Sequence, residues 1–353
     1  MKKIFVFMLA IVIVSSLILA GCAAPSAPSQ KLGTADVIDF KFSYHMPAPS
    51  SPGQAFKKWS DKVEEACNGK IKITHYSAQT LAKQSDQLDA VMSGLADIAL
   101  LATGAFPGRF PLSELVQLPM LYPNAEVSAK VNADLLEKYA ASREYKDLKL
   151  LWVFPMPPHG IIKRNPIETM EDWKGQKLRI EGKYENMMVE RMGGSGVYMS
   201  PMDLYSSIER GVVDGVIFQW DGALVYGIEK VTKYRTEAQF LCRGMPIVMN
   251  KAKWESLPPD IQQKFNEIGG VSYSTEAGVA ADELNIKRRQ ELVDYDKQAG
   301  NPGIYELPEA EMARWKAEAK IVQDTWAADC DKLGLPGTDM LNDALSLTAK
   351  YSQ

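Results

Sequence analysis

The fold is decided by residues 37–76, which begin with VIDFKFSYH (residues 37–45) and end with IKITHY (residues 71–76). Apolar and polar residues alternate in both runs, as is typical of half-buried β-strands. Between them, apolar residues recur at helical spacing from Ala55 to Val63, and Gly69 gives a stop signal. A strand, a helix and a second strand form the unit of a parallel sheet, whose crossover is right-handed almost without exception. The sequence therefore predicts an α/β fold.

The alternation of strand and helix continues along the chain. By the same criteria we expect strands at residues 96–101, 148–154, 160–163, 177–180 and 237–250, and helices at residues 84–93, 125–141 and 185–192. A long helical region begins at Pro258 and continues to residue 298. Residues 277–297 within it lack proline and could form one strut between domains, about 30 Å long at 1.5 Å per residue. The chain from Asp36 to Gln353 is longer than one core usually holds, so we expect two domains.

The first residues have the pattern of an export signal. Lys2 and Lys3 precede an apolar run from Ile4 to Ala20, which small residues end. A positive start, an apolar centre and small residues before the cut site are what a cleaved signal peptide requires. We predict a signal peptide over residues 1–21. An uncleaved single-span anchor is the alternative, and it would leave the following domain on the same side of the membrane.

Cys22 adds a second prediction to this segment. The run Leu19-Ala20-Gly21-Cys22 resembles the lipobox of bacterial lipoproteins, in which the cysteine becomes the lipidated N-terminus. Two or more acyl chains give stable membrane anchoring. Residues 22–35 are rich in proline and small residues, and we predict that they form a tether.

Composition and motifs exclude several functions. The net charge of -4, with mixed signs and no basic run, argues against nucleic-acid binding. The three histidines, at positions 45, 75 and 159, lack metal-ligand spacing, and no nucleophile elbow, dinucleotide fingerprint or P-loop is present. Residues 193–196, Gly-Gly-Ser-Gly, follow a helix and lack the P-loop lysine, so they are better explained as a turn. We therefore expect a protein that is not an enzyme and needs no cofactor or metal; a hydrolase on the same scaffold is the alternative.

The cysteines beyond the lipid site give little further information. Cys67, Cys242 and Cys330 are far apart and odd in number, so at most one disulfide can join them. No C-x-x-C motif is present, and buried free thiols are the favoured interpretation.

An ordered series of segments resembles the DctP-type substrate-binding proteins of tripartite ATP-independent periplasmic (TRAP) transporters over essentially the whole mature chain. The segments that carry the resemblance are His45-Met46-Pro47, residues 63–73, residues 90–98, Leu118-Pro119-Met120-Leu121-Tyr122, residues 166–179 and residues 204–215. The run LYSSIERGVVDG at residues 204–215 is the most specific of them.

The resemblance implies a two-domain, periplasmic-binding-protein-like clamp, with a sheet flanked by helices in each domain and a long helix bracing both. The first domain would comprise residues 36–160 plus 243–284, and the second residues 161–242 plus 285–353. The ligand would be a small organic acid held in the cleft, outside the carboxyl ends of the strands. The protein would be extracytoplasmic, held to a bacterial membrane by its lipid, and would serve an ion-driven TRAP permease. Delivery to an ATP-driven importer or a sensor kinase is the alternative.

Arg179 lies where the family keeps its ligand-anchoring arginine, at the end of the run Gly175-Gln176-Lys177-Leu178-Arg179. A guanidinium can donate two parallel hydrogen bonds to a carboxylate and stays charged at any working pH. Without the resemblance, Arg179 would read as an ordinary surface arginine. Glu181 and Asp221 could bind a ligand hydroxyl or amine, or pair with Arg179.

The resemblance also places the loop at residues 216–221 at the cleft, with Phe218 and Trp220 in it. Aromatic rings there favour a ligand with an apolar or aromatic body, although either ring could instead belong to the core. Gly182 and Asn165 depart from the side chains of sialic-acid binders and argue against that ligand.

Three residues of the first domain complete the predicted site. Tyr44 and His45 end the first strand, and Thr103 follows the strand near residue 100. His45 could contact the ligand, or it could cap the proline-rich loop that follows it.

Overall fold

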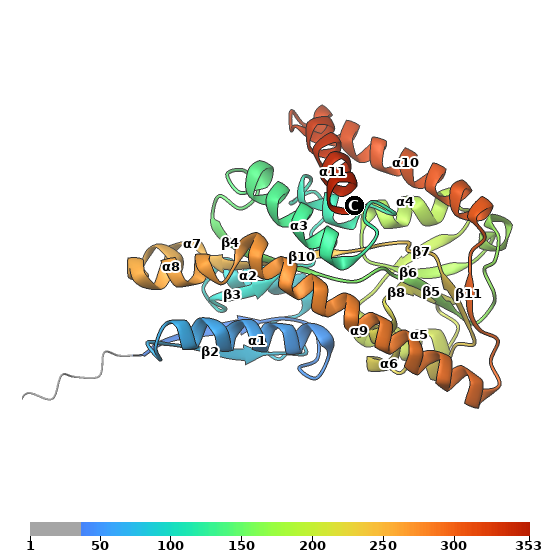
Figure 1. The fold of residues 1–353 in the computed structure, drawn as a ribbon, viewed down its shortest axis with the longest axis horizontal. Coiled ribbons are helices and arrows are strands. Elements are labelled where there is room, and N and C mark those ends of the chain that lie inside the picture. Colours follow the sequence, from blue (N-terminus) through green and yellow to red (C-terminus); the bar gives the residue numbers. More distant parts are fainter. Residues whose placement is uncertain (1–36) are drawn as a thin grey trace, which may run out of the picture. The chain divides into compact units, whose positions relative to one another are not determined.

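The computed structural model describes residues 37–353, in which two mixed sheets lie side by side, each covered by helices (Figure 1). The predicted signal peptide, Cys22 and the tether lie outside the described residues. In the described part of the chain, no helix is both long enough and apolar enough to cross a bilayer.

The first sheet contains the strands that decide the fold. Its order is β2-β1-β3-β10-β4, and its bounds are β1 Ile38–Ser43, β2 Ile71–Tyr76, β3 Ile98–Leu100, β4 Leu148–Pro155 and β10 Gly244–Asn250. Strand β1 is parallel to β2, in register from Ile38 opposite Ile71 to Ser43 opposite Tyr76. The predicted parallel strand–helix–strand unit is confirmed. Strand β10 returns to this sheet from far along the chain and pairs antiparallel with β3 and β4.

The second sheet holds the middle of the chain. Its order is β11-β9-β5-β8-β6-β7, and its bounds are β5 Gly160–Lys163, β6 Lys177–Ile180, β7 Ser195–Tyr198, β8 Gly215–Phe218, β9 Tyr234–Glu237 and β11 Gly303–Glu306. We call residues 37–156 and 242–268 lobe I, and residues 159–237 with β11 lobe II. The chain thus crosses between the sheets after β4 and again before β10. The predicted domain boundaries fall close to these crossings and stay a prediction.

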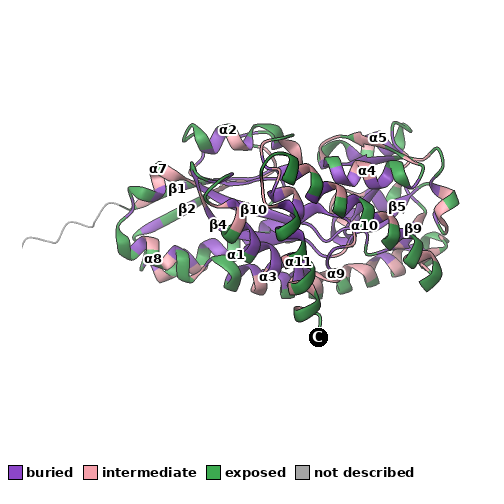
Figure 2. Cartoon of the chain, turned by 90° about the horizontal axis from the view of Figure 1, so that it is seen from above, coloured by how far each residue is buried: buried purple, intermediate pink, exposed green. Residues whose placement is uncertain are grey.

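Helices flank both sheets, and the strands are coloured mostly as buried (Figure 2). The bounds of the helices are α1 Ser51–Ala66, α2 Gln87–Met92, α3 Ala125–Leu135, α4 Lys183–Arg191, α5 Leu204–Glu209, α6 Trp220–Val225, α7 Lys251–Glu255, α8 Pro259–Glu267, α9 Gly270–Ala299, α10 Glu309–Lys332 and α11 Gly337–Tyr351. Two expectations need correction. The long helical region is broken between α8 and α9, where Gly270 has a φ of 55°. Residues 216–221 are not a loop, because they belong to β8 and α6.

Helix α9 is the predicted strut. At 1.5 Å per residue its 30 residues span about 45 Å, and it contacts β4 in lobe I and α6 and β11 in lobe II (Figure 1). Gly278 lets it approach α3, because a Cβ there would lie 2.8 Å from the Ala125 carbonyl oxygen. The Asp282 carboxylate on α9 accepts from the Ala125 and Glu126 N–H groups at 2.9 and 3.0 Å, which satisfies the free donors at the start of α3. The α/β clamp with a bracing helix is therefore confirmed.

Helices α10 and α11 were not singled out from the sequence, and they contact both lobes. Helix α11 packs on α3, while α10 packs on α4. The Gln323 side chain in α10 also donates to the Pro119 carbonyl of lobe I at 2.7 Å. Assigning residues 285–353 wholly to the second domain therefore describes these helices incompletely.

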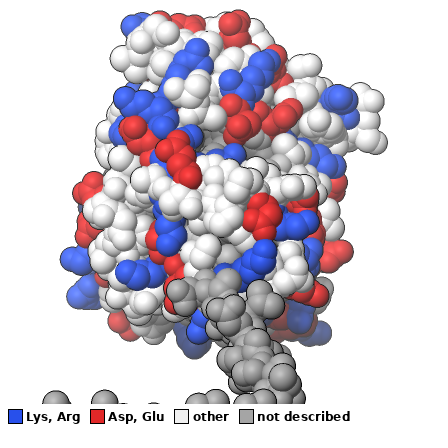
Figure 3. Space-filling model, turned by 90° about the vertical axis from the view of Figure 1, so that its left-hand side faces the viewer, with Lys and Arg blue, Asp and Glu red and all other residues white. Residues whose placement is uncertain are grey.

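Two further sequence expectations concern thiols and surface charge. Cys67, Cys242 and Cys330 are buried free thiols, so this interpretation is confirmed. Acidic and basic side chains are intermixed on the face shown in Figure 3, in keeping with a net charge of -4.

Candidate functional site

A small pocket with a cavity volume of about 20 Å³ lies between the lobes. Lobe I supplies seven of the lining residues: His45, Met46, Ser50, Pro52, Met156, Arg243 and Met245. Lobe II supplies the other nine: His159, Glu181, Pro201, Phe218, Gln219, Asp221, Gly222, Val225 and Tyr226. Methionine and aromatic side chains make up much of the wall, and charged groups are few. This lining suits a small ligand with an apolar body and one charged group, for which the lobes would have to part.

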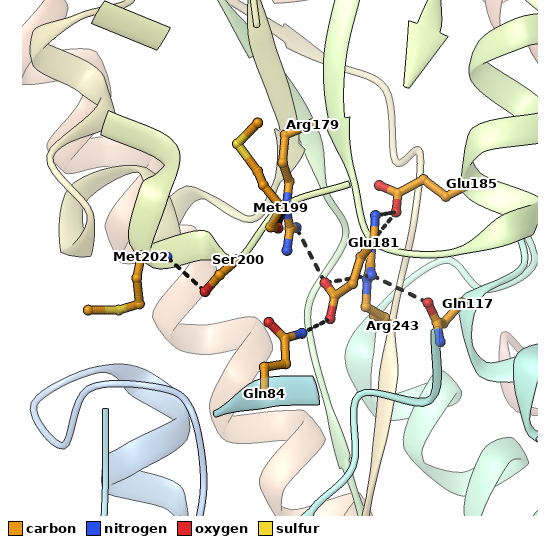
Figure 4. Close-up of polar contacts among 9 residues, drawn as sticks. All are labelled: Gln84, Gln117, Arg179, Glu181, Glu185, Met199, Ser200, Met202 and Arg243. Atoms are coloured by element: carbon orange, nitrogen blue, oxygen red, sulfur yellow. Dashed lines mark hydrogen bonds and ion pairs between the residues drawn. The ribbon is translucent and has the colours of Figure 1, made fainter. Parts of the chain in front are cut away.

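A buried ion cluster forms one end of this pocket (Figure 4). Arg179, at the end of β6, is 0% exposed, and its Nη1 lies 3.3 Å from the Glu181 carboxylate. Arg243 holds Glu181 and Glu185, each at 2.8 Å. The Gln84 amide donates to the other Glu181 oxygen at 2.9 Å. Burial raises the pKa of Glu181, but the charges of Arg243 and Arg179 outweigh it and lower the pKa to about 2, so this carboxylate is ionised at neutral pH.

The same cluster joins the two lobes. Gln84 and Arg243 belong to lobe I, whereas Arg179, Glu181 and Glu185 belong to lobe II. Beside the cluster, the backbones touch at two glycines. A Cβ on Gly104 of lobe I would lie 2.7 Å from the Glu181 carbonyl oxygen and 3.0 Å from the Gly182 Cα of lobe II. The lobes are thus closed on each other at this end of the pocket.

Asp221 also lines the pocket. Its carboxylate accepts from the Ser51 N–H of lobe I at 3.2 Å and pairs with Arg288 on α9 at 2.9 Å. Asp221 is therefore a second contact between the lobes, and its charge is already compensated.

Several buried polar groups beside the pocket lack partners within residues 37–353. Nη2 of Arg179 has no hydrogen bond, and Nη1 has only the ion pair at 3.3 Å. His45 and His159 are each 1% exposed, and none of their ring nitrogens is hydrogen-bonded. Burial lowers the pKa of His45 to about 4 and lowers that of His159 well below its usual value, with the Arg243 charge adding to the effect on His159. Since unmet buried hydrogen-bonding groups are costly, these are the groups that a ligand would satisfy.

The structure brings five of the predicted site residues together. His45, Glu181, Phe218 and Asp221 line the pocket. Arg179 does not line it, but pairs with Glu181 in its wall and lies 5.9 Å from the centroid of the Phe218 ring. Their contact with a ligand stays a prediction.

The other three predicted residues are buried away from the lining. Tyr44 packs in the lobe I core, its ring centroid 4.9 Å from that of Phe56. Thr103 accepts a hydrogen bond from Gln117 at 2.7 Å. Trp220 packs directly on Gly160 in the core of lobe II. Their contact with a ligand stays a prediction, and the core role weighed for Trp220 fits its surroundings.

Sequence reasoning missed Arg243, His159 and the three pocket methionines. A single arginine in the otherwise apolar run of residues 240–249 was a signal for Arg243, because a buried charge needs a partner. His159 directly follows Pro157 and Pro158, where the chain crosses between the two sheets. The methionines carry no local pattern that separates them from core residues.

Comparisons with known proteins agree with this architecture. The sequence model of the family described as bacterial extracellular solute-binding protein, family 7 (DctP) matches residues 42–329. The C4-dicarboxylate-binding periplasmic protein DctP of Rhodobacter capsulatus is 26% identical over 313 residues, which are 88% of this chain and 92% of that protein. A marine metagenome TRAP solute-binding protein specific for aromatic acid ligands, solved with 3-hydroxybenzoate, is 27% identical, with a TM-score of 0.83 over 90% of this chain and 100% of that chain. A TRAP solute-binding protein from Rhodoferax ferrireducens, solved with copurified benzoate, is 26% identical, with a TM-score of 0.82 over 90% of this chain and 99% of that chain.

Proposed function

We propose, from the premise that this chain belongs to the DctP family of bacterial extracellular solute-binding proteins, that it captures a small monocarboxylic acid with an apolar or aromatic body between its lobes. Family membership confirms the predicted resemblance and the prediction that the chain is a binding protein of a transporter rather than an enzyme. What remains to be proposed is the ligand, the residues that hold it, the membrane partner and the anchor.

The partly satisfied guanidinium of Arg179 carries the ligand proposal: its Nε donates to the Met199 carbonyl at 3.0 Å and its Nη1 lies 3.3 Å from Glu181, but neither Nη atom has a hydrogen bond to the described residues. It is fully buried at the pocket wall, and its Nη2 has no acceptor within residues 37–353. A carboxylate would supply the missing acceptors in a water-excluded site, where charge-assisted hydrogen bonds are strong. Arg243 lies on the other side of Glu181 and adds a second positive charge.

The apolar part of the pocket supports an apolar ligand body. Phe218, Tyr226 and three methionines line it. The relatives solved with benzoate and with 3-hydroxybenzoate show that aromatic acids suit this fold at 26% and 27% identity. Contacts from both lobes would favour the closed state, so binding energy would shift the clamp toward closure.

Binding of a panel of acids tests this proposal. By isothermal titration calorimetry, benzoate, phenylacetate and similar monocarboxylates should bind, and the Arg179→Met variant should bind at least roughly 30-fold more weakly, since losing a buried hydrogen-bonded charge costs about 2–5 kcal/mol. Arg210→Met, on an exposed helix end of the same lobe, is the matched control. Binding of neutral sugars alone, or an Arg179→Met variant as tight as wild type, would refute the proposal.

We also propose that the protein is anchored through a lipid on Cys22 and delivers its ligand to a TRAP permease. The family is extracytoplasmic, and several of its relatives are TRAP solute-binding proteins. The lipobox-like run before Cys22 supports the anchor. In a cell fractionation, Cys22→Ser should move the protein from the membrane to the soluble fraction; retention in the membrane would favour the uncleaved span. Loss of ligand uptake on deleting an ATP-driven importer, but not a TRAP permease, would contradict the delivery proposal.

A further inference from the structure

We propose that His45 and His159 form a hydroxyl-binding subsite, so that the preferred ligand is a hydroxy-substituted carboxylic acid rather than an unsubstituted one. This inference rests on the proposed function, because it assumes that a carboxylate is bound beside Arg179.

The two histidines form a pair that the pocket itself does not satisfy. His45 follows β1 in lobe I, His159 precedes β5 in lobe II, and both line the pocket. Each is 1% exposed, and all four ring nitrogens lack a hydrogen-bond partner within residues 37–353. Gln219 lies beside His159 without a hydrogen bond of good geometry. A ligand that enters between the lobes is therefore the partner available to both rings.

The charge state of the two histidine rings determines which hydrogen-bonding groups a ligand needs to satisfy them. Both are neutral at pH 7, because burial lowers their pKa values and nearby guanidinium groups oppose a further positive charge: Arg179 beside His45, and Arg243 and Arg179 beside His159. Glu181 raises both pKa values, and the Gln219 side chain also raises that of His159, but burial outweighs them. A neutral imidazole presents one N–H donor and one acceptor nitrogen. The pocket therefore offers two acceptor nitrogens as well as donors.

A carboxylate satisfies the donors but not these acceptors. It carries no hydrogen to donate when ionised. A ligand hydroxyl can donate to one ring and accept from the other, which satisfies both in one contact. An ammonium group could also donate, but it would lie near the Arg179 and Arg243 guanidinium groups, which would repel it. A hydroxyl is therefore the group that fits.

The size of the preference follows from the cost of leaving the rings unpaired. Sites built to hydrogen-bond a substrate hydroxyl reject the analogue lacking it strongly, because their buried polar groups are left unmet. Each lobe contributes one of the two rings, so a partial opening of the lobes can relieve some of this cost. We expect a preference of roughly 10- to 100-fold in Kd for the best hydroxylated isomer.

Matched acids and matched variants test the inference. Kd values would be measured by calorimetry for benzoate and its 2-, 3- and 4-hydroxy isomers, for phenylacetate and mandelate, and for 3-aminobenzoate. Each acid would be tested with the wild type and with four variants: His45→Leu, His159→Leu, His45→Gln and His159→Gln. His75→Leu is the control, since this third histidine lies on β2 outside the pocket lining. In the leucine variants, the Kd values for a hydroxy acid and for its parent acid should differ by no more than about twofold, whereas the wild-type difference should persist in His75→Leu. The glutamine variants, which keep a donor and an acceptor, should retain part of it.

Two outcomes would overturn the inference while leaving the proposed function intact. One is wild-type affinity for every hydroxy acid within twofold of that for its parent acid. The other is an unchanged preference in both leucine variants, whose thermal unfolding without ligand would establish that they are folded. If no acid of the set binds, or if Arg179→Met binds them as wild type does, the proposed function fails and the inference falls with it.

Discussion

Substitution of Gly104 by alanine should weaken ligand binding without destabilising the unliganded protein. The added Cβ would lie 2.7 Å from the Glu181 carbonyl oxygen and 3.0 Å from the Gly182 Cα, both of which are backbone atoms of the opposite lobe. Neither can move without separating the lobes. The substitution therefore raises the free energy of the closed state and leaves the fold of lobe I, which carries Gly104, unstrained.

The magnitude follows from the contact. Inserting a methyl group into a closely packed region costs about 1–3 kcal/mol when backbone has to shift. If the ligand binds only when the lobes are closed, this cost appears in full in the affinity, as a rise in Kd of roughly 5- to 150-fold. The free energy of unfolding without ligand should change by no more than about 0.5 kcal/mol, as for a surface substitution, because the open clamp relieves the overlap.

Gly182→Ala is the matched control, read out by calorimetry and by urea unfolding. A Cβ on Gly182 would meet Gln117 Oε1 at 2.8 Å, as a Cβ on Gly104 also would at 2.7 Å, but the nearest backbone atom of the opposite lobe is 3.7 Å away, so the control shares the Gln117 contact and lacks the backbone overlap. Its φ of -142° suits alanine. If Gly104→Ala binds ligand as tightly as Gly182→Ala, the contact between Gly104 and lobe II is not part of the ligand-bound state, and the reasoning is refuted.

Three further predictions concern stability. Arg243→Met should lower the free energy of unfolding in urea by about 3–5 kcal/mol, because it leaves the buried Glu185 without an ion pair in the described part of the chain and Glu181 with only the 3.3 Å pair to Arg179. Arg314→Met, which breaks pairs at the protein surface, should cost less than about 1 kcal/mol, and equal effects would contradict the cluster's role. His45, which faces Glu181 and Arg179, has a pKa of about 4 in the folded protein, so the unfolded chain takes up a proton first as the pH falls from 6.5 to 4, and His45 should contribute up to about 3 kcal/mol to a fall in stability over this window. Burial also lowers the pKa values of His75 and His159, so His45→Gln should make the fall smaller by the His45 contribution without abolishing it. Gly278→Leu should lower the thermal unfolding temperature, because a side chain would press on the α3 backbone 2.8 Å away, and a variant as stable as wild type would show that α9 can shift away.

Local sequence patterns predicted most of the framework. The strand–helix–strand unit at residues 37–76 was readable because alternation and helical spacing are local properties, and the structure has each element within a few residues of its expected position. Elements without a clear period were harder. The break at Gly270 was missed although Gly269-Gly270 is a turn signal, and α6 is too short for a period to be visible.

The site was only partly predictable, because its partners are distant in sequence. Glu181 was identified as able to pair with Arg179, two residues away, but its shorter contact is with Arg243, 62 residues further along. His45 and His159 come together only through the closing of two lobes. Arg179 itself was found through family resemblance, since one arginine at a strand end has no distinguishing local pattern.

The bracing of the two lobes has a mechanical consequence. Two chain crossings and α9 link the sheets, and α10 and α11 touch both lobes from another side. Because the lobes are linked at several points, they resist twisting and sliding relative to each other. The remaining motion is a hinge rotation of one lobe about a single axis. Helix α9 is about 45 Å long at 1.5 Å per residue, so small bends distributed along it would add up to a wide opening at the pocket entrance. The lobes could then admit a ligand while each lobe keeps its own fold.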